Sequence, residues 1–322
     1  MKNYEWKSSL SEYIRRYIEL RRTAGLKFLY QEVLFQRFDR FHFYGGYQGT
    51  EITREMVREF IYVRGESPNS WRAKEVLLRD FGTHMRNLGF HAYVPEVTTP
   101  EYRSGHIPHI YTQTELLRFF KAIEEYPVGT NSSRKTVDAV LFRFLYGTGA
   151  RISEALNLKV SDYDCENGAA LIRQGKNNRD RIVALHPSLM KRMNGFVEDF
   201  HKKSQPDTPL FPNSHMRRIK YNAIYDRFRD YLLMADIPHT GNGPRIHDFR
   251  HGFAVENLRR WSAEGGDLMN LMPYLAAYMG HSDYKATQYY LRLTAEIYPE
   301  MMEQLEAECM DIIPGGDCHE ET

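Results

Sequence analysis

A break in the helical pattern between Tyr93 and Pro108 divides this chain of 322 residues into two parts. The intervening stretch, YVPEVTTPEYRSGHIP, contains three prolines and one glycine and has no apolar periodicity, which is typical of an interdomain linker. A chain of this length is also too long for one ordinary core, so two domains are expected. The predicted parts are a first domain at 1–95, a linker at 96–110, a second domain at 111–294, and a C-terminal helix with an acidic tail at 295–322.

The first hundred residues are predicted to form about four helices with basic faces. Ser9 and Glu12 form a capping-box pattern before YIRRYIELRRT. A later helix is expected to begin at Pro68 and to end near Gly89. These patterns indicate a small helical domain.

The second part is predicted to be helical around one small β-hairpin. Thr112 and Glu115 form a capping box before LLRFFKAIEEY. The segments AALIR and RIVAL flank QGKNNRD, whose Gly and Asn residues favour a hairpin connection. Helical segments follow from about Pro187. The expected fold class is therefore mainly α with a small β-sheet (α+β).

The net charge of +1 conceals an asymmetry along the chain. Residues 299–322 contain eight Asp or Glu and no Lys or Arg, so residues 1–298 carry 43 basic against 34 acidic side chains, a net charge of +9. A moderately basic body is compatible with a polyanionic partner, although such charge is more often a solvated surface.

Composition gives no indication of export, a membrane span or a disulfide framework. The chain has no run of about 18 apolar residues, and its start, MKNYEWKSSL, has no apolar signal region. Cys165, Cys309 and Cys318 are too few and too scattered for disulfides or a CxxC metal site. A cytoplasmic protein with free thiols and no membrane partner is expected.

Residues 278–294, YMGHSDYKATQYYLRLT, hold four tyrosines within thirteen positions. Aromatic side chains at helical spacing usually pack, with the hydroxyl at the surface. Tyr289 and Tyr290 differ by about 100° around a helix, so either could face inward. The spacing alone leaves open whether one of these tyrosines reacts.

The segment GTGARISEAL is rich in glycine and precedes a helix. It lacks the spacing of a phosphate-binding GxxxxGK[ST] loop and does not follow a strand. Gly147 and Gly149 are instead expected to end one helix, so that Arg151 projects from the start of the next. Arg151 could serve a site there or could simply pair with Glu154.

In RIHDFRHGFA, His247 and His251 have the four-residue spacing of a zinc-binding HExxH helix. Asp248 stands where that motif has its general-base glutamate, and the Arg250 guanidinium would repel a cation, so zinc is disfavoured. A packed or capping histidine pair is the simpler alternative. Arg250 and His247 could also both donate hydrogen bonds to a phosphate oxygen.

Lys176 lies at the tip of the predicted hairpin. A lysine there is usually only solvated, but a hairpin tip could also carry an ammonium group to a leaving oxygen. Arginines, a lysine, histidines and a tyrosine, without paired carboxylates or a ligand cluster, describe a metal-free phosphoryl-transfer site. In such a site cations neutralise the phosphorane and the protein supplies the nucleophile. No cofactor is expected.

These segments resemble the tyrosine recombinases, also called the phage integrase family. TGARISEALNLKVSDYD is similar to the first box of that family, GKNNRDRIVAL to its β-hairpin, HDFRHGFA to its His-x-x-Arg box and MGHSDYKATQYY to its final box. The four occur in the family's order over residues 148–290, and the first hundred residues resemble its helical, SAM-like core-binding domain. Asn177 differs, since relatives often have glycine there.

The resemblance implies a role for each matching cation. Arg151 and Arg250 would clamp the scissile phosphate, and Lys176 would protonate the departing 5′ oxygen. His247 would assist proton transfer and contact the phosphate, and His281 would steady the phosphate.

The resemblance also implies which tyrosine reacts. Tyr290, nine residues after His281, would be the nucleophile, and its neighbour Tyr289 would pack. Glu154 resembles the family's acid that contacts the catalytic residues and not the phosphate, and His251 resembles a mainly structural histidine.

The implied activity is that of an enzyme, a site-specific DNA recombinase or integrase that works through a 3′-phosphotyrosyl intermediate. Its partners would be double-stranded DNA, further copies of the chain in a homotetramer on synapsed DNA, and an accessory DNA-bending protein. Its place in the cytoplasm would be the bacterial nucleoid. Two alternatives are a type IB topoisomerase and a catalytically silent DNA-binding regulator. The short helical first domain counts against the former, and an intact nucleophile counts against the latter.

In the C-terminal segment, Ile297, Met301 and Leu305 recur every four residues and predict an apolar stripe on a short helix. A lone helix of this length is marginal in water, so the stripe requires a docking surface. That surface could belong to the same catalytic domain or, as the resemblance implies, to a neighbouring protomer.

Overall fold

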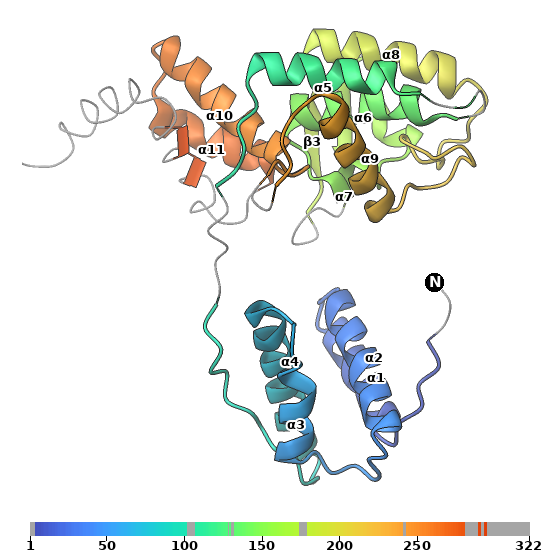
Figure 1. Cartoon of the computed structure of the whole chain (residues 1–322), viewed down its shortest axis with the longest axis vertical. Helices are drawn as coiled ribbons and strands as arrows, with labels where there is room; N and C mark the ends of the chain where they lie inside the picture. The colour runs from blue at the N-terminus through green and yellow to red at the C-terminus, as the bar shows by residue number, and fades with distance from the viewer. Residues whose placement is uncertain are drawn as a thin grey trace, which may run out of the picture. The chain divides into compact units, whose positions relative to one another are not determined.

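The computed structural model describes residues 4–101, 107–127, 129, 132–173, 179–240, 243–280, 289–290 and 293–294. The chain forms two compact units, Met1–Gly105 and His106–Thr322, each with its own hydrophobic core (Figure 1). Within the described ranges, no helix is long and apolar enough to cross a bilayer.

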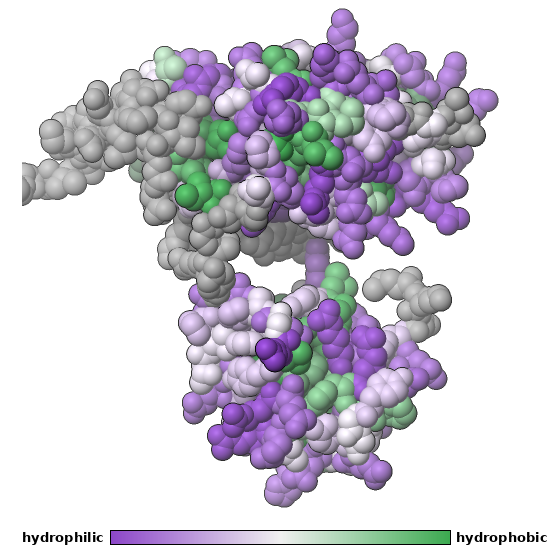
Figure 2. All heavy atoms as spheres, in the orientation of Figure 1, coloured by the Kyte–Doolittle hydropathy of each residue, from purple (hydrophilic) through white to green (hydrophobic). Residues whose placement is uncertain are grey.

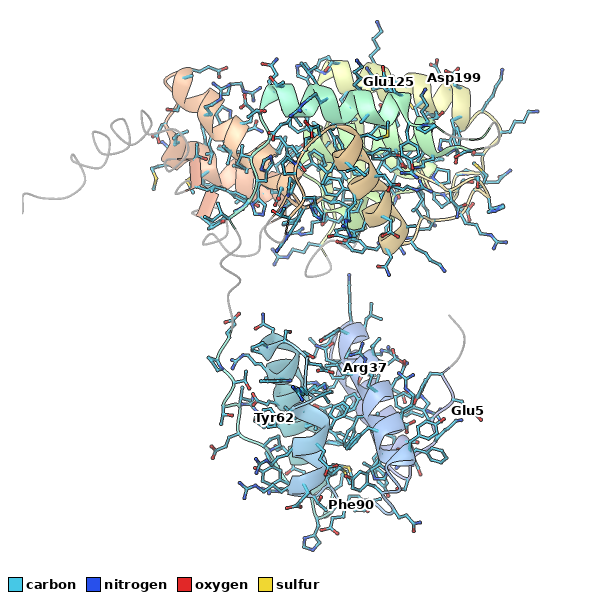
Figure 3. The ribbon with its side chains drawn as sticks, in the orientation of Figure 1. Glu5, Arg37, Tyr62, Phe90, Glu125 and Asp199 are labelled. Carbon is cyan, nitrogen blue, oxygen red and sulfur yellow. The ribbon has the colours of Figure 1, made fainter. Side chains whose placement is uncertain are left out.

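The first unit is helical, and its described residues form α1 (Ser11–Thr23), α2 (Leu29–Tyr44), α3 (Arg54–Ile61) and α4 (Pro68–Asn87). Side chains of these helices point into the space between them (Figure 3). Phe35, Phe38 and Phe81 are fully buried there. The prediction of about four helices is confirmed, and α4 begins at Pro68 as expected.

The predicted capping box of Ser9 and Glu12 is wrong. Helix α1 begins at Ser11 and has no side-chain hydrogen bond at its cap. The buried carboxylate of Asp39 on α2 organises this end instead, accepting hydrogen bonds from Ser8 Oγ at 2.6 Å and Ser11 Oγ at 2.8 Å. A partner so far away in the sequence does not show in a local pattern.

The second unit is mainly helical around a small sheet. Its described elements are α5 (Gln113–Glu125), α6 (Arg134–Thr148), α7 (Ile152–Ala155), the 3₁₀ turn η1 (Val160–Asp162), β1 (Tyr163–Asp164), β2 (Ala169–Ile172), β3 (Arg181–Ala184), α8 (Pro187–Phe200), α9 (Tyr221–Met234), α10 (Asp248–Ala263) and α11 (Leu268–Met279). The Thr112–Glu115 capping box opens α5 as predicted. The predicted fold class is confirmed.

The sheet has the order β1-β2-β3 in the described part of the chain. Strands β2 and β3 pair antiparallel, from Ala169 opposite Ala184 to Ile172 opposite Arg181, as the hairpin prediction required. Strand β1 has only two residues, which is too short for an alternating pattern to reveal.

Phe249, in the first turn of α10, anchors that helix in the core of the second unit. Its ring stacks on Tyr111 with the centroids 4.8 Å apart, and it lies 5.4 Å from Phe119 of α5 and 6.1 Å from Phe142 of α6. Aromatic contacts of this kind hold a helix in a defined rotation. The next residue, Arg250, is therefore held in a fixed direction.

Candidate active site

The turn between α6 and α7 positions Arg151. Helix α6 ends at Thr148, and Gly149 has φ +60°, where a Cβ atom would lie 2.7 Å from the Phe253 ring. Glycine tolerates both the left-handed backbone and the close approach. Arg151 then stands at the N-cap of α7, as the sequence predicted.

Glu154 is buried between two arginines. Its carboxylate accepts hydrogen bonds from Arg151 Nη1 at 2.8 Å and from Arg181 Nη1 and Nη2 at 3.0 and 2.7 Å. Burial alone would raise the pKa of Glu154, but the hydrogen bonds and charges of Arg181 and Arg151 lower it to about 2. The pairing of Arg151 with Glu154 that the sequence left open is present, and it orients an arginine whose side chain stays 21% exposed.

Arg250 carries a buried positive charge, since the residue is only 2% exposed. Its Nη1 donates to the Gly149 carbonyl at 2.6 Å, and its Nη2 donates to the Met279 carbonyl at 2.7 Å. Its charge also acts on the Tyr290 phenol, whose pKa it lowers against the raising effect of burial. Burial lowers the pKa of Arg250 to about 10, so the guanidinium stays charged at neutral pH.

The C-terminal end of α11 is surrounded by arginines. Three consecutive carbonyls each accept a hydrogen bond from a different guanidinium: Tyr278 from Arg181 at 2.9 Å, Met279 from Arg250 at 2.7 Å and Gly280 from Arg151 at 3.5 Å. The end of a helix exposes carbonyl groups with partial negative charge, which attracts cations. The turn before α7, strand β3 and helix α10, which carry these three arginines, therefore meet at the end of α11.

Tyr290 is the tyrosine that faces this cluster. It is 3% exposed, whereas Tyr289 is 37% exposed. The Tyr290 ring lies 5.3 Å from that of His251, centroid to centroid. Burial raises the pKa of Tyr290, and the charge and hydrogen bond of Arg250 oppose that rise. Geometry thus distinguishes two neighbours that helical periodicity left equivalent.

His247 and His251 begin α10. His247 is the N-cap residue rather than a residue within the helix, and the two rings meet edge to face with centroids 5.0 Å apart. Among the residues with described positions, no group of three or more His, Cys, Asp or Glu side chains is arranged to hold a metal ion. The pair lies instead beside the arginines and Tyr290.

The imidazole of His247 has an unusual acidity. Although the residue is exposed to solvent, the protein packed around its ring and the positive charges of Arg250 and Arg151 lower its pKa to about 4. The ring is therefore neutral at neutral pH.

Two predicted site residues, Lys176 and His281, lie outside the described residues. The other six, Arg151, Glu154, His247, Arg250, His251 and Tyr290, come together in one cluster.

Arg181 belongs to the same cluster and was not predicted. It is the first residue of β3, inside RIVAL, where it looks like an ordinary strand residue. The sequence could have indicated a paired arginine here, because a charged residue that begins an otherwise apolar strand is rarely buried without an acidic partner. Nothing local, however, identifies that partner as Glu154, 27 residues away in the sequence.

Comparison with known proteins places these residues in a wider group. The model of the phage integrase family matches residues 110–296, which include the whole cluster. The Sinorhizobium fredii protein y4rE, which is named as an integrase/recombinase, is 28% identical over 285 residues, 88% of this chain and 91% of that protein. Tyrosine recombinase XerA of Pyrococcus furiosus is 27% identical over 215 residues, 66% of each chain.

A solved structure shows the same fold. The lambda integrase dimer bound to a COC′ core site matches with a TM-score of 0.60 and 15% identity, covering 87% of this chain and 94% of that chain. At that identity the likeness concerns the fold alone.

We expect the imidazole of His247 to titrate well below its ordinary pKa of 6.5. Replacing Arg151 or Arg250 by Gln should raise this pKa, because one neighbouring positive charge is removed while burial remains. NMR titration of the histidine ring carbons, assigned with His247→Asn, measures both. A pKa of His247 that is the same in both arginine variants as in the unmodified protein would contradict the electrostatic account.

Proposed function

Because the chain belongs to the phage integrase family, we propose that it cleaves and rejoins DNA through a covalent bond between Tyr290 and a 3′ phosphate. The predicted family and the predicted class of activity, a tyrosine-type site-specific DNA recombinase, are confirmed. The topoisomerase and silent-regulator alternatives find no support in the relatives. The observation that carries the residue assignment is the burial of Tyr290 against His251 and beside the Arg250 charge, whereas Tyr289 is 37% exposed.

Arg250 and Arg151 are the proposed clamp for the scissile phosphate. Guanidinium groups suit the non-bridging oxygens of a phosphate, and they neutralise the charge that accumulates in the phosphorane. Carbonyl groups orient Arg250, and the Glu154 carboxylate orients Arg151. Prepositioned charges of this kind need no reorganisation when the reaction occurs.

In the proposed step, the Tyr290 oxygen forms a bond to phosphorus while the bond to the 5′ oxygen breaks. The negative charge of a bound phosphate would raise the pKa of His247, so that its imidazole can accept the phenol proton, and Lys176 donates a proton to the departing 5′ oxygen. His281 would steady the phosphate, and His251 would support Tyr290. The phosphotyrosyl bond preserves the energy of the cleaved bond, so attack by a 5′ hydroxyl can rejoin the strand without ATP.

The proposed partner is double-stranded DNA, contacted by the helical domain at residues 1–95 as well as by the catalytic domain. Phosphate contacts would supply most of the affinity, and contacts to base edges the sequence preference. We propose that the protein acts in the cytoplasm, at the bacterial nucleoid, and that an accessory protein bends the DNA.

A groove in the second unit supports the proposal of a homotetramer. It has a volume of about 810 Å³ and lies between α6, α8, α10 and α11. Its walls are aromatic, with Trp261 and Tyr274 among them, and Tyr274 is 72% exposed. Hydrophobic residues are visible over α10 and α11, and also over the middle of this unit (Figure 2).

The C-terminal segment of a neighbouring protomer is the proposed occupant of this groove. The groove presents three arginines and one acid around its apolar walls, namely Arg143, Arg192, Arg260 and Glu256. Arg143 and Arg192 also lie close to Glu124. The segment lies outside the described residues, and its sequence combines the predicted apolar stripe with the many acidic side chains of residues 299–322. Both its net charge and its hydropathy would complement the groove. Docking of this kind would link the Tyr290 segment to assembly and keep isolated protomers from cutting.

We expect Tyr290→Phe to bind a single site with unchanged affinity and to form no covalent adduct, because only the phenol oxygen is lost. Tyr289→Phe is the matched control and should still form the adduct. Trapping on a nicked suicide substrate, followed by denaturing electrophoresis, distinguishes them. An inactive Tyr289→Phe beside an active Tyr290→Phe would reverse the assignment.

The groove proposal predicts that Tyr274→Asp binds a single site normally but forms no synaptic complex and does not recombine. Leu233→Asp on α9 is the matched control, since Leu233 is an apolar side chain that is 83% exposed and lies outside the groove. Truncation after Thr294 should have the same effect as Tyr274→Asp. Native gel shifts and a two-site recombination assay measure these outcomes.

Mixing the two defective proteins tests docking between protomers. The truncated protein retains the groove and Tyr274→Asp retains the segment, so a mixture should form a DNA-bound dimer that neither forms alone. If the segment docks on its own domain, no mixture will restore the dimer. Recombination at the normal rate by the truncated protein would also contradict the proposal.

A further inference from the structure

Arg181 joins strand β3 to both Glu154 and the C-terminal end of α11. All three of its guanidinium nitrogens are used: Nε donates to the Tyr278 carbonyl at 2.9 Å, while Nη1 and Nη2 donate to the two carboxylate oxygens of Glu154. Its side chain is 11% exposed. Such a planar fork matches a carboxylate in a way that a lysine ammonium does not.

Backbone geometry allows this guanidinium to reach the end of α11. Gly280 has φ +67°, and a Cβ atom there would lie 2.9 Å from Arg181 Nη1. Glycine therefore provides both the left-handed helix end and the space for the arginine. The guanidinium packs directly against the residue that precedes the segment leading to Tyr290.

The partner of Arg181 is also the partner of Arg151. Each oxygen of Glu154 is shared between them, since Oε1 accepts from the side chains of both arginines and Oε2 accepts from Arg181 Nη2 and the Arg151 backbone N–H. Without Arg181, Glu154 would lose two of these four hydrogen bonds and could turn away from Arg151. The Tyr278 carbonyl would lose its side-chain partner as well.

We propose that Arg181 is a positioning residue for strand cleavage, which fixes Glu154 behind Arg151 and ties the C-terminal end of α11 to the same carboxylate. The inference rests on the proposed roles of Arg151 and Tyr290. Arg181 touches neither the phosphate nor the nucleophile in this account. It sets the distance between the phosphate clamp and the segment that carries Tyr290.

The test compares cleavage of a nicked suicide site by wild type, Arg181→Ala and Arg181→Lys. We expect single-site affinity within a few-fold of wild type and cleavage slower by on the order of 10²-fold in Arg181→Ala, the loss that a displacement of about 1 Å can cause. Arg181→Lys should recover only part of the rate, because one ammonium cannot reach Glu154 in the same forked way and also the Tyr278 carbonyl.

Arg227→Ala is the matched control for a purely structural effect. Arg227 Nη1 donates at 2.9 Å to Asp138, which is fully buried, and the Arg227 side chain is 20% exposed. Its loss also removes a guanidinium from a buried carboxylate, but that carboxylate does not contact Arg151. Arg227→Ala should therefore lower the melting temperature and leave the cleavage rate of the folded protein unchanged.

A methylphosphonate at the scissile position separates positioning from general damage. This group lacks one anionic oxygen, so its cleavage depends less on a correctly aimed arginine. The rate deficit of Arg181→Ala relative to wild type should shrink on this substrate. A deficit of equal size on both substrates, or a cleavage rate equal to that of wild type, would overturn the inference.

The same assay keeps this inference distinct from the proposed function. If the wild-type protein forms no covalent adduct, or if Tyr290→Phe forms the same adduct, the proposed function is wrong, whatever rate Arg181→Ala shows. If wild type forms that adduct and Arg181→Ala forms it equally fast, only the role of Arg181 fails.

Discussion

The arrangement of the site depends on the burial of one positive charge, the Arg250 guanidinium. A charge that is 2% exposed is costly unless it is fully hydrogen-bonded. The Gly149 and Met279 carbonyls accept two such bonds, and the Tyr290 phenol lies beside the same charge. Gly149 precedes Arg250 by 101 residues, and Met279 follows it by 29. One side chain thus requires the turn after α6, the end of α11 and the tyrosine segment to meet.

The two arginines of the proposed clamp are held in different ways. Arg250 is buried and donates to backbone carbonyls, whereas Arg151 donates to the Glu154 carboxylate and keeps a partly exposed side chain. The position of Arg250 is therefore fixed by the backbone around it. The Arg151 guanidinium is free to contact a phosphate on its exposed side while Glu154 keeps its hydrogen bonds to Arg151. Arg181 also holds Glu154 from β3, so in the proposed site the short sheet would contribute to the chemistry as well as to the core.

Much of this could be predicted from local pattern and family resemblance. The glycine-rich turn before Arg151, the antiparallel hairpin and the α5 capping box are encoded within a few residues, and the structure contains all three. The false capping box at Ser9 and the unpredicted role of Arg181 have the opposite cause. Asp39 and Glu154 are distant in sequence from the residues they bind, and a local pattern does not specify such pairs.

The central claim is that the buried Tyr290, and not the exposed Tyr289 beside it, forms the bond to DNA. The most direct measurement is mass spectrometry of the peptide that remains attached to the 3′ end of a cleaved suicide substrate after proteolysis. Our account predicts a nucleotide linked through phosphate to Tyr290 in the wild-type protein. A nucleotide on Tyr289, or attachment to any other residue, would contradict it.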